Sequence, residues 1–293
     1  NSTRLHCGSL GLSQPGGQSC ASCHHPDAGF VDPDLFLPVS EGVLPDRFGD
    51  RNSPSAAYAM YSPVRYFDDE EGLWIGGQFW DSRATGEELG DPLADQALGP
   101  FTNPVEMANH ERWTVIRDVA NSDYKDLYEM VWPGTNLDAW SRFTPAEMDM
   151  AYEQVALAIA AFERTEDFPP FNSKYDAYLK TCLELGGDPA DCAIGEGAKA
   201  KKAGQAIFSA EEWVGLQLFM GENDNDGVLG KKEGAMCAAC HVAEWTPAAG
   251  NVIVPEWAPA GMVPPVFTDF TYDNLGVPKN TAYPLDPGAP IDL

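Results

Sequence analysis

The chain has 293 residues and 44% hydrophobic side chains, which is enough for two domains of about 150 residues with buried cores. Its formal net charge of −27 is spread along the sequence and would repel phosphate backbones, which excludes nucleic acid as an expected partner. The longest apolar run, Val155 to Phe162, is far shorter than the ~20 residues of a membrane span, so no transmembrane segment is expected.

Two C-x-x-C-H motifs stand 213 residues apart in the chain. They consist of Cys20, Cys23 and His24, and of Cys237, Cys240 and His241. The Cys and His frequencies of this sequence predict about 0.003 chance occurrences, so coincidence is a poor explanation. Two thiols at this spacing can reach both vinyl groups of one haem, and the following histidine can bind its iron. The sequence therefore predicts two covalently attached haem c groups.

Two other interpretations of these motifs stay open. A redox-active C-x-x-C would need a thioredoxin-like strand and helix around it, and a zinc site would combine both motifs in one coordination sphere. Covalent haem attachment belongs outside the cytoplasm, so we expect a periplasmic protein that has been exported and is present in its mature form.

Long stretches rich in Gly and Pro, 31–55 and 246–293, are typical of irregular loops that wrap over a cofactor. No segment shows sustained alternation of polar and apolar residues. The expected fold is therefore all-α, with two cytochrome-c-like haem domains and long irregular loops. We place the domains at 1–168 and 169–293, with the boundary beside Pro169-Pro170.

Three helices are expected from their start signals. One begins at Asn103 with Pro104 in its first turn and continues through Ile116. The strongest spans 144–163, where Thr144 and Glu147 form a capping box before a helical apolar repeat. A third begins at Ser209, has Glu212 at the capping position, and carries Trp213, Leu216 and Phe219.

The remaining cysteines are Cys7, Cys182 and Cys192. The last two bracket a Leu-Gly-Gly-Asp-Pro turn sequence and could close a short disulfide loop in an oxidising compartment. Two buried free thiols are the alternative. Cys7 has no assigned partner.

The segment 222–233 resembles an EF-hand loop. Its candidate calcium ligands, at loop positions 1, 3, 5 and 12, are Glu222, Asp224, Asp226 and Glu233. The competing interpretation is a solvated acidic loop.

Five short sequences occur in a characteristic order between and beside the haem motifs. They are Arg-Asn-Ser-Pro at 51–54, Phe-Trp-Asp-Ser-Arg-Ala at 79–84, Gln-Ala-Leu-Gly-Pro at 96–100, Asn-Pro-Val-Glu-Met at 103–107 and Ala-Phe-Glu-Arg-Thr at 161–165. Together they resemble the ordered motifs of the bacterial dihaem cytochrome c peroxidase and MauG family, and the resemblance covers most of the chain.

This resemblance implies a peroxide-reacting N-terminal haem and an electron-transferring C-terminal haem, with Trp80 between them. Glu106 would lie over the open iron face as a proton carrier, and Gln96 would line the same pocket. Asn52 would be a ligand of a calcium ion, for which oxygen ligands are suitable. Arg83 would hold a haem propionate.

Three of these roles have a simpler alternative. Glu106 stands three residues after Asn103 and could only cap a helix. Trp80 could be an ordinary core residue, and Arg83 a surface ion pair.

The sequence departs from the family in two places. Many members keep a histidine in the loop corresponding to 37–50, but this chain has none there, so we expect a first haem that is five-coordinate or water-bound at rest, as in MauG. The family's closing block has no match before Leu293, so the C-terminal domain is expected to be incomplete. Met262 and Tyr272 are the visible candidates for a sixth ligand of the second haem.

Three functions follow from these expectations. The first is reduction of hydrogen peroxide with electrons from a small redox protein. The second is MauG-like oxidation of side chains on a partner protein. The third is a non-catalytic dihaem electron shuttle.

Overall fold

The computed structural model describes residues 11–34, 36–221 and 234–272, which form two compact units. Unit 1 runs from the N-terminal side to Glu163 and includes Tyr272, and unit 2 comprises Arg164–Thr271. The division after Glu163 lies close to the expected boundary beside Pro169-Pro170. Because the units by themselves identify no haem, the two haem domains at 1–168 and 169–293 stay a prediction.

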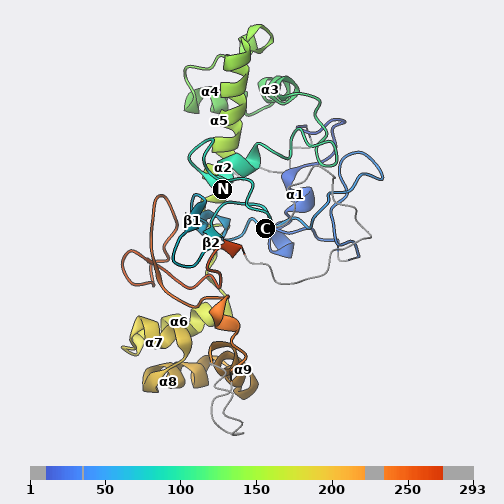
Figure 1. Ribbon diagram of the computed structural model, residues 1–293. Coiled ribbons are helices and arrows are strands. Elements are labelled where there is room, and N and C mark those ends of the chain that lie inside the picture. The colour runs from blue at the N-terminus through green and yellow to red at the C-terminus, as the bar shows by residue number, and fades with distance from the viewer. Residues whose placement is uncertain (1–10, 35, 222–233, 273–293) are drawn as a thin grey trace. The chain divides into compact units, whose positions relative to one another are not determined.

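Unit 1 combines helices with long irregular segments (Figure 1). Its helices are α1 Cys20–Cys23, α2 Pro92–Ala97, α3 Arg112–Ala120, α4 Lys125–Val131 and α5 Pro145–Glu163. Three 3-10 turns, Pro26–Ala28, Ala59–Tyr61 and Leu137–Arg142, connect them. The core lies where α2 and α3 pack against α5, around Val115, Ile116, Leu137 and Tyr152.

The expected helix 144–163 is confirmed as α5. The Thr144 backbone N–H donates to Oε2 of Glu147 over 2.7 Å, and the Glu147 N–H donates back to the Thr144 hydroxyl. Tyr152 and Val155 bury their side chains on the core face of this helix. The Tyr152 hydroxyl also donates to the Leu98 carbonyl over 2.6 Å, which ties α5 to the end of α2.

The helix expected from Asn103 is wrong in its start, because α3 begins only at Arg112. Residues 103–108 form a tight turn in which the Asn103 carbonyl accepts from the N–H groups of both Glu106 and Ala108. Ala108 has a φ of 54°, in the left-handed region, which stops a right-handed helix from propagating. The Asn-Pro start signal therefore belongs to a turn and not to a helix.

The fold is mostly helical but not purely α. Among the described residues, short strands form a three-stranded sheet of order β1-β2-β5 and a pair β3-β4. Their bounds are β1 Tyr66–Asp68, β2 Leu73–Ile75, β3 Thr246–Pro247, β4 Met262–Val263 and β5 Thr271–Tyr272. Strands of two or three residues are too short to produce a recognisable alternating pattern, which explains why the sequence predicted none.

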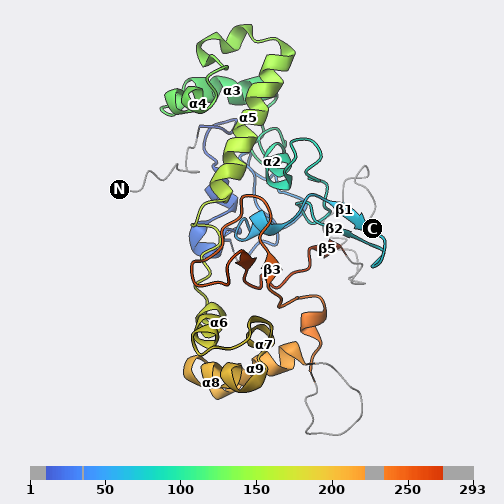
Figure 2. The same cartoon turned by 90° about the vertical axis from the view of Figure 1, so that its left-hand side faces the viewer.

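Figure 2 shows the helices of unit 2 gathered around one core. They are α6 Lys174–Glu184, α7 Pro189–Ile194, α8 Gly197–Ile207 and α9 Ala210–Met220, followed by the 3-10 turn Cys237–Ala239. The helix expected from Ser209 is confirmed as α9, with the Ser209–Glu212 capping box in place. Trp213 of α9 packs against this core, with its ring centroid 6.0 Å from that of Tyr178.

The expected disulfide between Cys182 and Cys192 is confirmed. Both cysteines are fully buried and join α6 to α7 across the turn that contains Gly187. Cys7 lies outside the described residues. None of the described helices is long and apolar enough to cross a membrane.

Candidate functional site

The first C-x-x-C-H motif forms α1, a single helical turn. The His24 N–H donates to the Cys20 carbonyl over 2.8 Å, and the His24 ring places Nδ1 3.1 Å from the Phe30 carbonyl. Burial lowers the pKa of His24, which favours the neutral ring. In a neutral ring that donates from Nδ1, the Nε2 lone pair is available for a metal.

The second motif repeats this arrangement in unit 2. The His241 N–H donates to the Cys237 carbonyl over 2.8 Å, and Nδ1 of His241 lies 3.2 Å from the Phe267 carbonyl. Phe30 and Phe267 both adopt left-handed backbone conformations, with φ of 60° and 58°. The two histidines are therefore oriented in the same way by carbonyls of the same residue type.

These residues fit a c-type haem at each motif. The thiols of Cys20, Cys23, Cys237 and Cys240 are outside disulfide bonds, as thioether attachment requires. In each histidine Nδ1 lies against a backbone carbonyl, so that Nε2 is available to bind iron. In the part of the chain that the structure describes, no group of three or more His, Cys, Asp and Glu side chains could hold a metal ion.

The segment 51–54 connects the first motif to the rest of unit 1. The Ser53 hydroxyl donates to the Cys23 carbonyl over 2.9 Å and accepts from the Asp32 N–H over 3.0 Å. Next to it, the Asn52 carbonyl accepts from the Trp80 indole N–H over 2.8 Å. This one short segment therefore fixes both the haem motif and the expected relay tryptophan.

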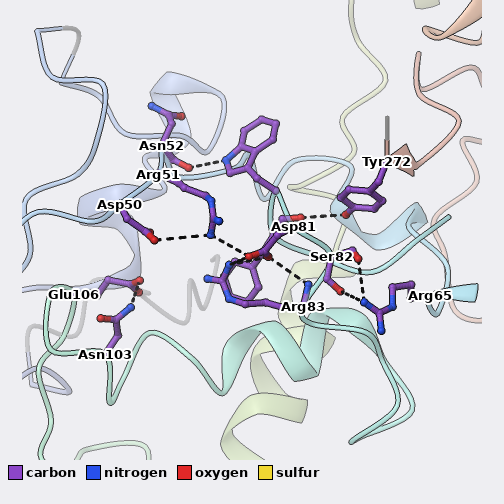
Figure 3. A network of polar contacts seen from close by, with 12 residues as sticks. Asp50, Arg51, Asn52, Arg65, Asp81, Ser82, Arg83, Asn103, Glu106 and Tyr272 are labelled. Carbon is purple, nitrogen blue, oxygen red and sulfur yellow. Dashed lines mark hydrogen bonds and ion pairs between the residues drawn. The ribbon is translucent and has the colours of Figure 1, made fainter. Parts of the chain in front are cut away.

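Asp81 lies between two arginines in the same network (Figure 3). Its carboxylate is 3.0 Å from Nη1 of Arg51, and Nη1 of Arg83 contacts both of its oxygens at 2.8 and 3.0 Å. The Arg83 guanidinium also stacks over the Phe79 ring at 3.7 Å. Arg83 thus has the ion pair that the simpler alternative foresaw, while its charge also acts on Glu106.

Glu106 is a partly buried carboxylate in the 103–108 turn. Its Oε1 accepts from the Asn103 side-chain amide over 2.6 Å, a contact between side chains and not a helix cap (Figure 3). Burial raises the pKa of Glu106, and the charge of Asp50 raises it further. The Arg83 charge and the Asn103 hydrogen bond act in the opposite direction. The result is a carboxyl group that can change protonation state closer to neutral pH than an exposed glutamate.

The loop at 37–50 lies against the backbone of Glu106. Its central part is a hairpin in which Glu41 pairs with Phe48, and the Val43 N–H donates to the Glu106 carbonyl over 2.8 Å. A Cβ on Gly42 would clash with the Val105 carbonyl, so this close approach requires glycine. The histidine-free loop is thus part of the surroundings of Glu106.

Gln18 links that hairpin to the haem motif, and the sequence did not reveal it. Its side-chain amide donates to the Glu41 carbonyl over 3.0 Å and lies 3.9 Å from the Cys23 sulfur. The Glu106 charge also raises the pKa of the Cys23 thiol, after the larger effect of burial. The expected proton carrier and the first haem motif are therefore within electrostatic reach of each other.

The other expected site residues are less closely joined. The Gln96 side chain, on α2, makes no hydrogen bond to another described residue. Trp80 is 60% exposed within this chain, so it is not a core residue. The Asn52 side-chain amide donates to the Pro38 carbonyl over 3.2 Å, and its role as a calcium ligand stays a prediction.

The candidates for a sixth ligand have different surroundings. Burial raises the pKa of Tyr272 to about 12, and its hydroxyl donates to the Phe79 carbonyl over 3.1 Å within unit 1. Met262 belongs to β4 in unit 2, where it faces Pro247 in the strand register. The EF-hand-like loop Glu222, Asp224, Asp226 and Glu233 lies outside the described residues.

Two curated proteins are similar in sequence to most of this chain. The chain is 30% identical over 273 residues to the methylamine utilization protein MauG of Paracoccus denitrificans, covering 92% of this chain and 54% of the relative. It is 29% identical over 225 residues to the cytochrome c peroxidase Ccp of Escherichia coli, covering 76% of this chain and 32% of that protein.

A solved structure agrees with these sequence relationships. The diheme peroxidase BthA from Burkholderia thailandensis superimposes with a TM-score of 0.63 at 27% identity, covering 94% of this chain and 54% of that one. The chain therefore spans about half the length of several relatives that it matches. The sequence model of the family described as di-haem cytochrome c peroxidase matches residues 9–182, which is more than half of the chain. This protein belongs to the di-haem cytochrome c peroxidase family, whose members are oxidoreductases with two haem groups.

Proposed function

We propose that this protein reduces hydrogen peroxide at a haem c in unit 1, with electrons relayed from a haem c in unit 2. Cys20, Cys23 and His24 would hold the first group, and Cys237, Cys240 and His241 the second. When bound, haem supplies the iron at which peroxide is reduced. The observation that carries the proposal is Glu106, a partly buried carboxylate with a raised pKa whose charge reaches Cys23.

Glu106 is suited to moving the proton that peroxide reduction requires. Two electrons and two protons convert one hydrogen peroxide into two waters. Asn103 holds Oε1, and Oε2 makes no hydrogen bond to a described residue, so Oε2 can take a proton from one peroxide oxygen and deliver it to the departing one. A carboxyl group does this best when its pKa lies near the working pH, which burial favours here.

The remaining roles follow from the family and from the contacts around Glu106. Arg83 contributes positive charge near the carboxylate and would hold a haem propionate. Gln96 would line the peroxide pocket, and Trp80, fixed by its hydrogen bond to Asn52, would relay electrons. A calcium ion at Asn52 and a periplasmic location complete the proposal. The net charge of −27 favours a basic redox protein as electron donor.

Substitution of Glu106 tests the central step. The holoprotein carrying Glu106→Gln keeps a side-chain oxygen for Asn103 but loses the titrating carboxylate, so its reaction with peroxide should slow by about 10²-fold or more in stopped-flow measurements. Haem content should not change. The matched control is Glu111→Gln, an exposed carboxylate five residues later that makes no cap hydrogen bond. A Glu106→Gln protein that reacts at the wild-type rate would leave only the electron-shuttle function.

The second candidate function is oxidation of side chains on a partner protein. The 37–50 loop favours it, because this loop packs on Glu106 and offers no histidine to occupy the iron. Steady-state consumption of peroxide with a reduced small redox protein would support the peroxidase. Peroxide-dependent covalent change in a partner protein, without such turnover, would support side-chain oxidation.

A further inference from the structure

Phe267 connects the second histidine to the core of unit 2. Its carbonyl lies 3.2 Å from Nδ1 of His241, and its ring packs edge-on against two other rings. The Tyr175 ring centroid is 4.9 Å away, and that of Phe219 is 5.6 Å away. Phe219 also lies 6.2 Å from the His241 ring. Phe267 is therefore held by its side chain while its backbone contacts the histidine.

The backbone of Phe267 needs such support. Its φ of 58° lies in the left-handed region, which is unfavourable for a residue with a Cβ. Among the described residues, no hydrogen bond to the Phe267 N–H compensates this cost. The next hydrogen bonds along the chain are local ones within 268–271. Among the described residues, packing of the Phe267 ring against Tyr175 and Phe219 is thus the interaction that can hold the Phe267 carbonyl in place.

Tyr175 is anchored at its other end. It belongs to α6, and its hydroxyl donates over 2.7 Å to the carbonyl of Ala193, a buried residue of α7. Ala193 directly follows Cys192, whose disulfide to Cys182 joins α7 back to α6. Burial raises the pKa of Tyr175, so its hydroxyl keeps the proton that it donates. A covalently closed pair of helices therefore fixes the ring that packs on Phe267.

We propose that Tyr175 is a positioning residue for the second haem ligand, because it holds Phe267 in the conformation that keeps its carbonyl on Nδ1 of His241. The proposal rests on the proposed function only in that His241 binds iron. An acceptor on Nδ1–H makes the opposite ring nitrogen a stronger electron donor, which favours ferric over ferrous iron. Weakening this contact should raise the reduction potential of the C-terminal haem.

The chain offers a matched control for this idea. Tyr178 lies on the same helix, and its hydroxyl donates to the neighbouring Cys192 carbonyl over the same distance of 2.7 Å. Its ring packs against Phe208, Trp213 and the Tyr175 ring, contacts that phenylalanine would keep, but not against Phe267. Tyr178→Phe therefore removes an equivalent hydrogen bond to the same disulfide-closed loop without touching the residue beside His241.

The experiment is redox potentiometry of the holoprotein with Tyr175→Leu, Tyr175→Phe and Tyr178→Phe. Tyr175→Leu, which removes the packing ring, should give a positive shift of the C-terminal haem potential. Tyr175→Phe should give a smaller shift of the same sign, and Tyr178→Phe none. As a second readout, exchange of the His241 Nδ1 proton should be fastest in Tyr175→Leu and unchanged in Tyr178→Phe.

The outcomes separate this proposal from the proposed function. If the wild-type protein shows no second haem potential, the dihaem function itself fails. If that potential exists but Tyr175→Leu leaves it unmoved, the positioning role is wrong. Equal shifts in Tyr175→Phe and Tyr178→Phe would also overturn it, because both would then act through general loosening of the loop. Should Tyr175→Leu not fold, the comparison of the two Tyr→Phe proteins decides.

Discussion

The two histidine sites reach the same local geometry by different means. In unit 1 the carbonyl beside His24 belongs to Phe30, six residues later in the chain. Two backbone hydrogen bonds fix it: the Phe30 N–H donates to the His25 carbonyl, and the Ala56 N–H donates to the Phe30 carbonyl. In unit 2 the corresponding carbonyl lies 26 residues after His241 and is held by aromatic rings from two helices. The same contact between a histidine Nδ1 and a backbone carbonyl is therefore held by backbone hydrogen bonds in one unit and by ring packing in the other.

The difference suits two different tasks. The first site continues into a polar network in which Ser53 contacts the motif, Asp81 pairs with Arg51 and Arg83, and Arg83 acts on Glu106. Such a network can hold and move protons. The rings beside the second site carry no titrating group except the phenol of Tyr175, which burial keeps neutral. This difference supports the proposal that unit 1 handles protons and unit 2 delivers electrons.

Removing one motif at a time should break this comparison most strongly. Cys20→Ser with Cys23→Ser should abolish the reaction with peroxide, because the haem beside Glu106 is lost. Cys237→Ser with Cys240→Ser should keep a first rapid reaction with peroxide but lose turnover with a reduced donor. Haem staining after denaturation and stopped-flow absorbance would check both. If the second pair abolished the rapid reaction and the first pair did not, the assignment of the two units would be reversed.

A smaller effect is expected from the hydroxyl that supports the first motif. Ser53→Ala removes the hydrogen bonds to the Cys23 carbonyl and from the Asp32 N–H, and should lower the stability of unit 1 by about 1–3 kcal/mol. Thermal unfolding followed by haem absorbance would measure this change. The transition of unit 2 should not move. The control is Ser55→Ala, which loses two exposed hydrogen bonds, one to the Gly29 carbonyl and one from the Ala57 N–H, neither of which touches the motif.

The parts of the site that follow from local chemistry could be predicted from sequence. The α5 cap requires Thr144 and Glu147 three residues apart, and the Cys182–Cys192 disulfide closes a short turn sequence. Thioether attachment at the Cys-Cys-His spacing stays a prediction. The same reasoning gave a wrong start at Asn103, because the left-handed Ala108 ends the turn and no sequence rule marks an alanine for that conformation. Family resemblance supplied Glu106, whose burial no local pattern would reveal.

Contacts between distant segments could not be predicted in this way. Gln18 carries no motif, yet it joins Cys23 to the 37–50 hairpin. Phe267 is one phenylalanine among 14, and its role depends on a backbone conformation and on packing against a helix 92 residues earlier in the chain. Such roles are set by tertiary packing, which leaves no periodic signal in the sequence.

The smallest expected effect is a shift of the pH–rate profile when the charges around Glu106 are changed. The direction of that shift is the informative result. If Glu106 acts as a carboxylate, the rate of reaction with peroxide should rise with pH through its raised pKa. Arg83 lowers that pKa, so Arg83→Gln should move the acid limb of the pH–rate profile to higher pH. Asp50 raises it, so Asp50→Asn should move the limb to lower pH.

Both variants act on unit 1 alone, so the reduction potential of the C-terminal haem should stay constant. Removing a positive charge and removing a negative charge beside the same carboxyl group must move its pKa in opposite directions. If both variants moved the acid limb in the same direction, a group other than Glu106 would control the profile.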